Sequence, residues 1–535
     1  MSQGARGLSD YLLRMDIIWE ALMPKLTKII ATIGIRKANY DSLKDDTARN
    51  LFNRKASEYL DTLIDAGMDV ARFNLSFAPA AFYLPYMRMA KQEAAKRGKR
   101  LGILCDLQGP KVRLGKIPAG IGEVKMGQEL RFRAEGIDRE EDGIIPIIYH
   151  DPRFDLLAQV PPDSKLFIDE GHIICKITKI EKPYLIAVVV KEGHLEPGKG
   201  IFVQAEDGSM VTFDMSPVTD KDEDDLKALN GAPDAVDHIA LSFVRRASDI
   251  QNLRKKYLDG PLSGKSIVAK IETAEAVTDR ERLTSIIRAS DGVMVARGDL
   301  GIEKPLPELL RYQKDIIPLC IRERIFVVVA TQMLESMTSN EFPTRAEVSD
   351  VANAVYDGAD AVMLSAETAV GKYPAESVHM MADICLAAER HQATKEYAEF
   401  HPGYLIEPLE WGKDKIAASA AVAAVDLARG VGAKAFLVNS RSGNTAMLVA
   451  RLRPQIPIAA LTNNEDVIGK LTLLRGVHPF LGILGQGVEE SLNAGLKQIC
   501  ARGLCKVGDT IIYLSGSHIG IGGASNQLRV VDVVL

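Results

Sequence analysis

The chain has 535 residues, of which 47% are hydrophobic and 26% are charged, and its formal net charge is −5 at pH 7. This length is too great for one hydrophobic core, so we expect several domains. The negative charge argues against a nucleic-acid-binding protein, and no apolar run reaches the ~18 residues that a membrane-spanning helix needs. Six scattered cysteines without a CxxC pair predict reduced thiols and a cytoplasmic location.

The first 26 residues contain one amphipathic segment, SDYLLRMDIIWEALM (9–23), which we expect to form a helix on the outside of the fold. Short apolar runs rich in β-branched residues follow, and near-continuous runs are typical of parallel strands buried on both faces. Helix-patterned segments separate most of them, including 343–358, where Thr344 and Glu347 could form a capping box. The runs lie at 28–34, 69–76, 101–109, 238–244, 266–272, 292–301, 326–333 and 359–367.

Eight strand-then-helix units predict a (β/α)8 barrel over residues 27–112 and 215–385. Nearly every run ends in polar groups, and all strand ends of such a barrel meet at one mouth. A single polar strand end fits simple exposure to solvent, but this many Arg, Asp and Glu residues favour a shared site. The polar residues are Arg72, Asn74, Ser76, Asp106, Ser242, Lys270, Glu272, Arg297, Asp299, Thr331, Ser365 and Glu367.

The run IVAKIET (267–273) carries two charges at the end of a buried strand. Lys270 and Glu272 are two residues apart, so their side chains lie on the same face. Burying a charge is costly unless it is paired or binds an ion. The two residues form either a structural ion pair at the barrel rim or part of a site, and the nearby Gly298–Asp299 pair favours the site.

Residues 113–214 separate the third run from the fourth, which is far more chain than one crossover helix needs. They contain short strand-like segments at 129–134, 165–171, 172–180 and 184–193, punctuated by glycine and proline. We predict a small β domain that grows from a barrel loop. It could act as a lid over the mouth or be a passive insertion.

After Pro374 the barrel pattern ends, and residues 386–535 read as a separate α/β domain that follows a helix at 381–391. Further strands are expected at 456–462 and 509–516. A loop between a strand at 434–438 and a helix at 447–454 could bind phosphate through free N–H groups, or be a plain capping loop. Its candidate residues are Ser440, Ser442, Gly443, Asn444 and Thr445. The glycine-rich stretch 516–525 could close over a ligand there and is weak evidence for a dinucleotide site.

The motifs of the chain after residue 26 resemble those of pyruvate kinases in their order and spacing. The resemblance implies a barrel A domain with the active site, a lid B domain and an effector-binding C domain. The motifs are ARFNLS (71–76), DLQGPKVR (106–113), SFVRRASD (242–249), VAKIETAEAV (268–277), MVARGDLGIE (294–303), ATQMLESM (330–337), PTRAEVSDVANAV (343–355) and MLSAETAVGKYP (363–374).

The resemblance implies transfer of a phosphoryl group from phosphoenolpyruvate to ADP, followed by protonation of the enolate, in the last step of glycolysis. Glu272 and Asp299 would bind Mg²⁺, with Mn²⁺ as an alternative ion. Lys270 would face the migrating phosphoryl group, and Arg72 would bind its oxygens. The substrate carboxylate would lie at Gly298 and Asp299, where glycine lets backbone N–H groups approach an anion.

Thr331 would deliver or orient the proton for the enolate, through a relayed water because a hydroxyl alone is too weak an acid. Ser242, Ser365 and Glu367 would form an outer shell of that relay, or make ordinary hydrogen bonds at the mouth; Ser242 is also a candidate substrate-binding residue.

For the nucleotide, ADP or ATP, the resemblance implies Asn74, Arg113 and Lys199 as contacts. The family often has His where this chain has Phe77 and Pro where it has Ile35, and the lid segment IFVQA (201–205) also departs from the family pattern. These differences leave base binding, ribose binding and nucleotide preference open.

Many pyruvate kinases need K⁺, and the matching ligands here would be Asn74, Ser76 and Asp106. Members that require K⁺ resemble one another in having Glu where this chain has Lys111. Our hypothesis is that the Lys111 ammonium supplies the missing charge and makes K⁺ dispensable. Lys111 could instead be an exposed residue without a role.

The resemblance also implies a homotetramer, with the helix that carries Arg345 near a subunit contact, and a phosphorylated effector: a sugar monophosphate, fructose bisphosphate or AMP. Two other functions are weighed against the kinase. One is a Mg²⁺-enolate lyase or aldolase on the same barrel, which would need neither the lid nor the C-terminal domain. The other is a phosphoenolpyruvate sensor that no longer turns over.

Overall fold

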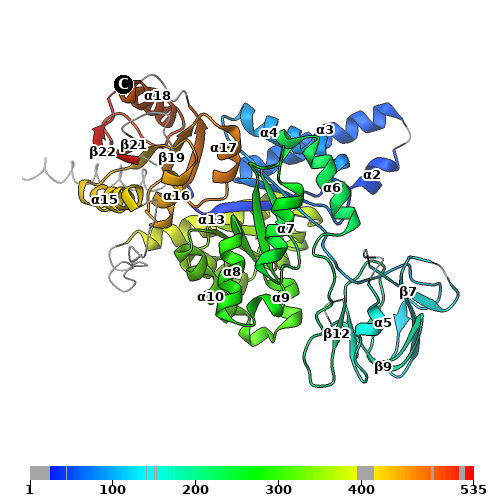
Figure 1. The fold of residues 1–535 in the computed structure, drawn as a ribbon. Coiled ribbons are helices and arrows are strands. Elements are labelled where there is room, and N and C mark those ends of the chain that lie inside the picture. The colour runs from blue at the N-terminus through cyan, green and yellow to red at the C-terminus, as the bar shows by residue number, and fades with distance from the viewer. Residues whose placement is uncertain are drawn as a thin grey trace, which may run out of the picture.

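The computed structural model of the chain contains a barrel, an inserted β domain and a C-terminal α/β domain (Figure 1). The predicted N-terminal helix (9–23) and nearly all of the glycine-rich stretch 516–525 lie outside the described residues. The structure describes residues 24–43, 45–139, 141–149, 151, 154–169, 171–394, 415–482, 487–516 and 525–534.

Eight parallel strands close into the predicted (β/α)8 barrel, in the order β1-β17-β16-β15-β14-β13-β3-β2. Each predicted run contains one of these strands, which confirms the fold class. Their bounds are β1 Lys28–Thr32, β2 Val70–Asn74, β3 Gly102–Asp106, β13 His238–Leu241, β14 Ser266–Ile271, β15 Gly292–Ala296, β16 Phe326–Ala330 and β17 Ala361–Leu364.

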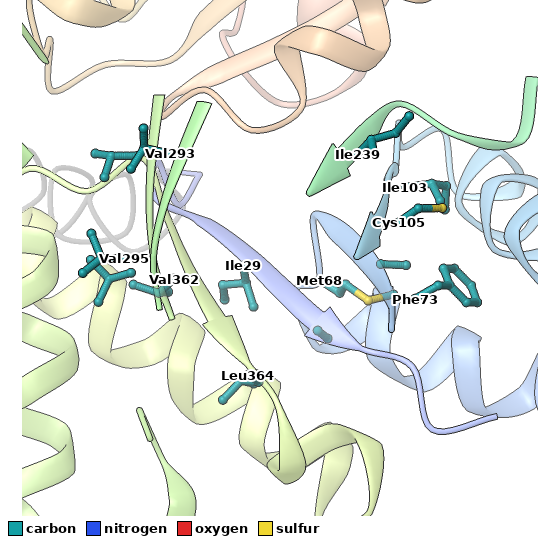
Figure 2. Packing of buried hydrophobic residues seen from close by; sticks show 14 of the residues in the cluster. Ile29, Met68, Phe73, Ile103, Cys105, Ile239, Val293, Val295, Val362 and Leu364 are labelled. Atoms are coloured by element: carbon teal, nitrogen blue, oxygen red, sulfur yellow. The ribbon is translucent and has the colours of Figure 1, made fainter. Parts of the chain in front are cut away.

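Side chains alternate between the two faces of the barrel wall. One set packs against the surrounding helices, as Ile29, Phe73, Ile103, Val295 and Leu364 do in Figure 2. The other set forms a second buried cluster that includes Ile30, Val70, Leu104, Ala240 and Val268. Two residues beyond each of these five, on the same face, the side chain is polar. These polar residues are Thr32, Arg72, Asp106, Ser242 and Lys270.

Helices cover the outside of the barrel, and side-chain caps fix where several of them begin. The predicted capping box is confirmed: Thr344 Oγ1 accepts from Glu347 N (3.3 Å), and Glu347 Oε2 accepts from Thr344 N (2.7 Å). The longer helices are α3 Asp46–Ala66, α4 Ala80–Lys96, α6 Asp220–Asn230, α7 Ala247–Tyr257, α8 Arg280–Ala289, α10 Leu309–Arg322, α11 Arg345–Tyr356 and α13 Pro374–Gln392; shorter ones are α2 Lys37–Asp41, α9 Arg297–Glu303 and α12 Ala366–Ala369.

The inserted domain is a seven-stranded sheet in the order β12-β8-β9-β10-β6-β7-β4, with a small β11-β5 pair beside it. It has a core of its own, which includes Phe132, Leu166, Cys175 and Leu185. The four predicted segments overlap β6, β8, β9 and β10, whereas β7, with Pro146 in it, β12 and the two-residue strands β4, β5 and β11 were missed. The bounds are β4 Arg113–Leu114, β5 Glu123–Val124, β6 Glu129–Gly136, β7 Ile144–Ile148, α5 Leu156–Gln159, β8 Lys165–Ile168, β9 Ile173–Glu181, β10 Tyr184–Lys191, β11 Gly193–His194 and β12 Ile201–Gln204.

The C-terminal domain is a five-stranded sheet in the order β20-β19-β18-β21-β22, parallel except for the β21–β22 pair. Buried polar contacts join it to the barrel: Asp360 pairs with Arg451 (2.8 Å) and Arg453 (2.9 Å), and His238 contacts Thr472 (3.0 Å). Its elements are α15 Lys415–Val431, β18 Ala435–Asn439, α16 Asn444–Arg451, β19 Ile458–Thr462, α17 Glu465–Leu471, β20 Val477–Leu481, α18 Val488–Ala501, β21 Thr510–Gly516 and β22 Ser525–Asp532.

In the part of the chain that the structure describes, none of the helices has both the length and the hydropathy to span a bilayer.

Candidate active site

Lys270 lies at the centre of a buried polar cluster at the barrel mouth. Its Nζ donates to Ser242 Oγ (2.8 Å) and lies 3.3 Å from carboxylate oxygens of both Asp106 and Glu272. Burial alone would lower the pKa of Lys270, but the charges of Asp106 and Glu272 outweigh it and raise the pKa. Lys270 is therefore a fixed cation. Lys270 contacts Ser242, Asp106 and Glu272, whereas the sequence suggested a contact with Glu272 alone.

Arg72 is held by the same acid. Its Nε and Nη2 donate to Asp106 Oδ2 (2.9 and 2.7 Å), and its Nη1 donates to Thr32 Oγ1 (2.7 Å). Burial alone would raise the pKa of Asp106, but Lys270 and Arg72 together hold it below its ordinary value. Asp106 thus stays ionised and orients two cations toward the mouth. Thr32, which sequence reasoning missed, lies two residues beyond Ile30 on the inner face of β1.

Glu272 follows β14 and is fully buried. Its Oε1 accepts from the backbone N of Phe243 (2.7 Å), whose φ of 54° is unusual for a bulky residue. Its Oε2 accepts no hydrogen bond. Burial raises the pKa of Glu272 to about 7. Lys270 Nζ, 3.3 Å from Oε2, is the cation beside it in the structure. Because Oε2 accepts no hydrogen bond, it is free to bind a metal ion as well, and the metal-ligand role of Glu272 stays a prediction.

Asp299 lies in the first turn of α9, not at the end of strand β15 as the sequence run 292–301 suggested. Its Oδ1 is 2.5 Å from Lys111 Nζ. Burial alone would raise the pKa of Asp299, but the Lys111 charge and hydrogen bond lower it. The charge of Asp299 in turn contributes to the raised pKa of Glu272, so the two carboxylates share one electrostatic environment.

Gly298 and Thr331 are directly connected. The Gly298 N–H, in the first turn of α9, donates to Thr331 Oγ1 (2.8 Å), which itself donates to the Ala330 carbonyl (2.7 Å). Thr331 and Gln332 have φ values of 70° and 53°, a strained backbone of the kind that clusters at functional sites. The predicted glycine loop is therefore a helix N-terminus, where first-turn N–H groups have no partner within the helix.

The strained turn after β16 is held from behind by Arg297. This buried guanidinium donates to the Thr331 carbonyl (2.8 Å) and pairs with Asp350 (2.7 Å). Glu367 connects the loops that follow β16 and β17, because its carboxylate accepts from Leu334 N (3.1 Å) and Ser365 N (2.7 Å). These contacts favour a positioning role for Glu367 over a place in a proton relay.

The nucleotide candidates of the lid make contacts inside the lid. Arg113 donates to the Gly198 carbonyl (2.8 Å), and Lys199 pairs with Asp169 (3.1 Å) and Glu196 (3.2 Å). Burial lowers the pKa of Arg113, and the charge of Asp299 opposes that shift, so Arg113 lies close enough to the mouth to interact with it.

Lys111 contacts the lid as well as the mouth. Its Nζ lies 5.6 Å from the ring centroid of Phe202 and 5.8 Å from that of Phe243, and a Cβ at Gly200 would lie 2.9 Å from Lys111 Cε. Among the predicted monovalent-ion ligands, Asn74 Oδ1 accepts from the backbone N of Ser76 (3.0 Å). The ion-pair partner of Lys111 is therefore Asp299, on the divalent-ion side of the mouth.

The loop of the C-terminal domain is partly helical. Helix α16 begins at Asn444, three residues before the predicted start at 447, and Gly443 precedes it with φ 83°. The predicted effector residues therefore divide between a loop (Ser440, Ser442, Gly443) and the first turn of a helix (Asn444, Thr445). Ser440 and Thr445 are buried, and Ser442 Oγ accepts from Asn444 N at 3.4 Å.

A barrel mouth that combines two oriented cations, two buried carboxylates and a helix N-terminus is typical of an enzyme site for an anionic substrate. Comparison with known families narrows this class. A model described as "Pyruvate kinase, barrel domain" matches residues 24–378, and one described as "Pyruvate kinase, alpha/beta domain" matches residues 418–531.

Curated pyruvate kinases align with nearly the whole chain. A pyruvate kinase of Agrobacterium vitis is 36% identical over 511 residues, covering 95% of this chain and 96% of its own length. One of Sporosarcina psychrophila is 34% identical over 94% of this chain and 80% of its own length, and one of Thermotoga maritima is 33% identical over 95% and 99%. The chain belongs to the pyruvate kinase family of transferases.

Proposed function

We propose that this chain transfers the phosphoryl group of phosphoenolpyruvate to ADP with a divalent ion, Mg²⁺ or Mn²⁺, bound by Glu272 and Asp299. The observation that supports it most strongly is the fully buried Glu272 carboxylate, whose Oε2 lies 3.3 Å from Lys270 Nζ but accepts no hydrogen bond. Two carboxylates suit Mg²⁺, which keeps several waters and takes further ligands from substrate phosphates. When bound, the ion would neutralise charge on the phosphate oxygens and the enolate oxygen.

The remaining groups of the mouth bind and orient the substrate. Lys270 and Arg72 present permanent positive charge, held in place by Asp106, to the oxygens of the phosphoryl group as it moves. The substrate carboxylate binds at the first-turn N–H groups of α9, at Gly298 and Asp299, and the Gly298 N–H exchanges its bond to Thr331 Oγ1 (2.8 Å) for one to the carboxylate. Ser242 is less suited to direct substrate contact, because its Oγ already accepts from Lys270 and donates to the Leu107 carbonyl (2.8 Å).

Thr331 takes part in protonating the enolate. Its hydroxyl lies between the Gly298 N–H and the Ala330 carbonyl, so it can orient a water but cannot supply a proton by itself at neutral pH. The strained backbone at Thr331 and Gln332 fixes the direction of this hydroxyl.

A coupled assay tests the proposal. Pyruvate formation from phosphoenolpyruvate and ADP should require added Mg²⁺ or Mn²⁺ and stop with excess EDTA. Turnover of phosphoenolpyruvate without ADP, or of an aldol substrate, would favour the lyase or aldolase function. Binding of phosphoenolpyruvate without turnover would favour the sensor.

The nucleotide is proposed to enter between lid and mouth, with Arg113, Lys199 and Asn74 as its contacts. Arg113 lies at the base of the lid, and Lys199 is held by two acids that phosphate oxygens could replace.

We also propose that the enzyme is a cytoplasmic homotetramer and that residues 440–445 bind a phosphorylated effector. Sedimentation of the full chain and its activation by sugar phosphates and AMP test these two proposals.

K⁺ is proposed to be dispensable, because the Lys111 ammonium brings a positive charge to the mouth, where its ion-pair partner is Asp299 rather than one of the predicted monovalent-ion ligands. Turnover of the wild-type chain should be the same in potassium chloride and tetramethylammonium chloride. Lys111→Glu should lose most of its activity in tetramethylammonium and regain it with K⁺, whereas Lys111→Met should be weakened in both salts. Strong activation of the wild-type chain by K⁺ would contradict the proposal.

A further inference from the structure

Two thiols face each other at the end of α18 in the C-terminal domain. Cys500 lies in the last turn of α18, and Cys505 follows the end of the helix. Their Sγ atoms are 3.2 Å apart. The remaining cysteines are buried one by one in separate elements, and each is a free thiol: Cys105, Cys175, Cys320 and Cys385.

The backbone, rather than chance side-chain contact, brings these thiols together. After α18 the chain reverses at Gly503, whose φ is 69°, and Leu504 N–H donates to the Ile499 carbonyl (3.0 Å). This is the six-to-one bond of a Schellman C-cap, which folds the chain back along the last helical turn. A Cβ at Gly503 would meet nothing within 4 Å, so the glycine is needed for its backbone conformation.

The two thiols differ in access to solvent. Cys500 is half-buried, whereas Cys505 is 2% exposed and belongs to the buried cluster that includes Leu496 and Tyr513. Burial and the contact with Cys500 raise the pKa of the Cys505 thiol. A dissolved oxidant therefore reaches Cys500 first, and Cys505 can react only with what is already attached to Cys500.

We propose that Cys500 and Cys505 form a reversible dithiol–disulfide site, with Cys500 as the attacking thiol and Cys505 as the resolving thiol. The sulfurs need to approach by about 1 Å to reach the ~2.05 Å bond length of a disulfide. This site is distinct from the barrel mouth and does not rest on the proposed function.

The reaction balances with a low-molecular-weight disulfide as oxidant. The Cys500 thiolate attacks one sulfur of oxidised glutathione, which forms a mixed disulfide and expels one glutathione thiolate. Cys505 then loses its proton to solvent and attacks the Cys500 sulfur, which releases the second glutathione. The protein dithiol loses two electrons and two protons, and one glutathione disulfide becomes two glutathione thiols.

Peptide mapping of the full chain tests this site. The reduced protein is incubated in buffers with increasing ratios of oxidised to reduced glutathione, and remaining thiols are then blocked in denaturant with N-ethylmaleimide. Trypsin cuts after Lys497, Arg502 and Lys506, so QICAR (498–502) and GLCK (503–506) stay together only if a disulfide joins them. We expect the linked pair to accumulate with the ratio and to vanish with dithiothreitol, while the other cysteines are recovered blocked.

Two variants separate the roles of the thiols. Cys505→Ala should stop at a mixed disulfide, with one glutathione on Cys500, and Cys500→Ala should leave Cys505 without glutathione. The proposal is overturned if the wild-type protein carries glutathione on Cys500 but does not form the linked peptide pair. It is also overturned if a buried cysteine such as Cys320 is oxidised as readily as Cys500. It is equally overturned if a non-reducing gel shows that the linked pair joins two chains. The wild-type map decides the question even if a variant fails to fold.

Discussion

At the scale of the residue, the site follows from where apolar side chains give way to polar ones on the inner face of the barrel. Val268, Lys270 and Glu272 lie on one face of one stretch of chain, so the strand that buries the first also carries the other two to the mouth. The sequence could predict this because a strand has a period of two. It could not predict that Asp106 would bind both Arg72 and Lys270, because that contact depends on the closure of the barrel.

Thr331 provides a residue-scale test of the proton step. Thr331→Val has nearly the same shape but loses the hydroxyl that accepts from Gly298 N–H and donates to the Ala330 carbonyl. We expect kcat to fall by about 100-fold, the lower range for loss of a group involved in proton transfer. Steady-state kinetics of pyruvate formation measure this.

Thr331→Ser, which keeps the hydroxyl, is the matched control and should retain most of the activity. Equal kcat values for Thr331→Val and the wild-type chain would exclude this hydroxyl from the reaction.

At the scale of the element, the sequence predicted near-continuous apolar segments well and interrupted ones badly. All eight barrel strands were found, because each is a near-continuous apolar run. Strand β7 was missed because Pro146 interrupts its pattern, and β12 was missed although it is as long as the predicted strand β8. Helix α9 was read as the tail of a strand, since the two glycines in RGDLGIE weaken a helical pattern.

The capping box of α11 gives a prediction for one element. Thr344→Ala removes the hydroxyl that accepts from Glu347 N and leaves a helix N–H without its partner. We expect a loss of about 1 kcal/mol of stability, seen as a lower thermal unfolding midpoint in calorimetry.

Thr344→Ser keeps the cap and should unfold close to the wild-type midpoint. If the alanine variant unfolds at the same temperature as the serine variant, the cap does not stabilise the barrel.

At the scale of the whole molecule, buried polar contacts join the barrel to the C-terminal domain, and His238 is one of them. It begins β13 and contacts Thr472 at 3.0 Å. Burial, assisted by the Lys91 charge, lowers the pKa of His238 to about 3. Because the unfolded chain takes up the proton near the ordinary pKa of about 6.5, the stability that neutral His238 contributes is complete above that pH and declines as the pH falls toward 3.

Lowering the pH from 6.5 to 5 should therefore cost the wild-type chain about 1.5 kcal/mol through His238 alone. The His238→Asn variant has no titrating side chain at this position, so its stability should fall by about 1.5 kcal/mol less over the same pH range. Calorimetric midpoints of the two proteins across this range measure the difference, and parallel curves would show that His238 is not buried neutral.

The central claim concerns the whole site: one divalent ion is bound at the barrel mouth by Glu272 and Asp299. The most direct measurement is Mn²⁺ binding to the full chain with phosphoenolpyruvate present, followed by electron paramagnetic resonance. Glu303→Gln is the matched control, because Glu303 is a neighbouring carboxylate with a pKa raised to about 7 by burial, and a glutamine carbonyl can still accept from Ala274 N.

We expect the wild-type chain and Glu303→Gln to bind Mn²⁺ alike. Glu272→Gln and Asp299→Asn should each weaken Mn²⁺ binding by at least about 100-fold. Loss of a residue that only supports a metal ligand already weakens binding by up to about 100-fold, and these two residues are the ligands themselves. Unchanged Mn²⁺ affinity in either of these two variants would contradict the account.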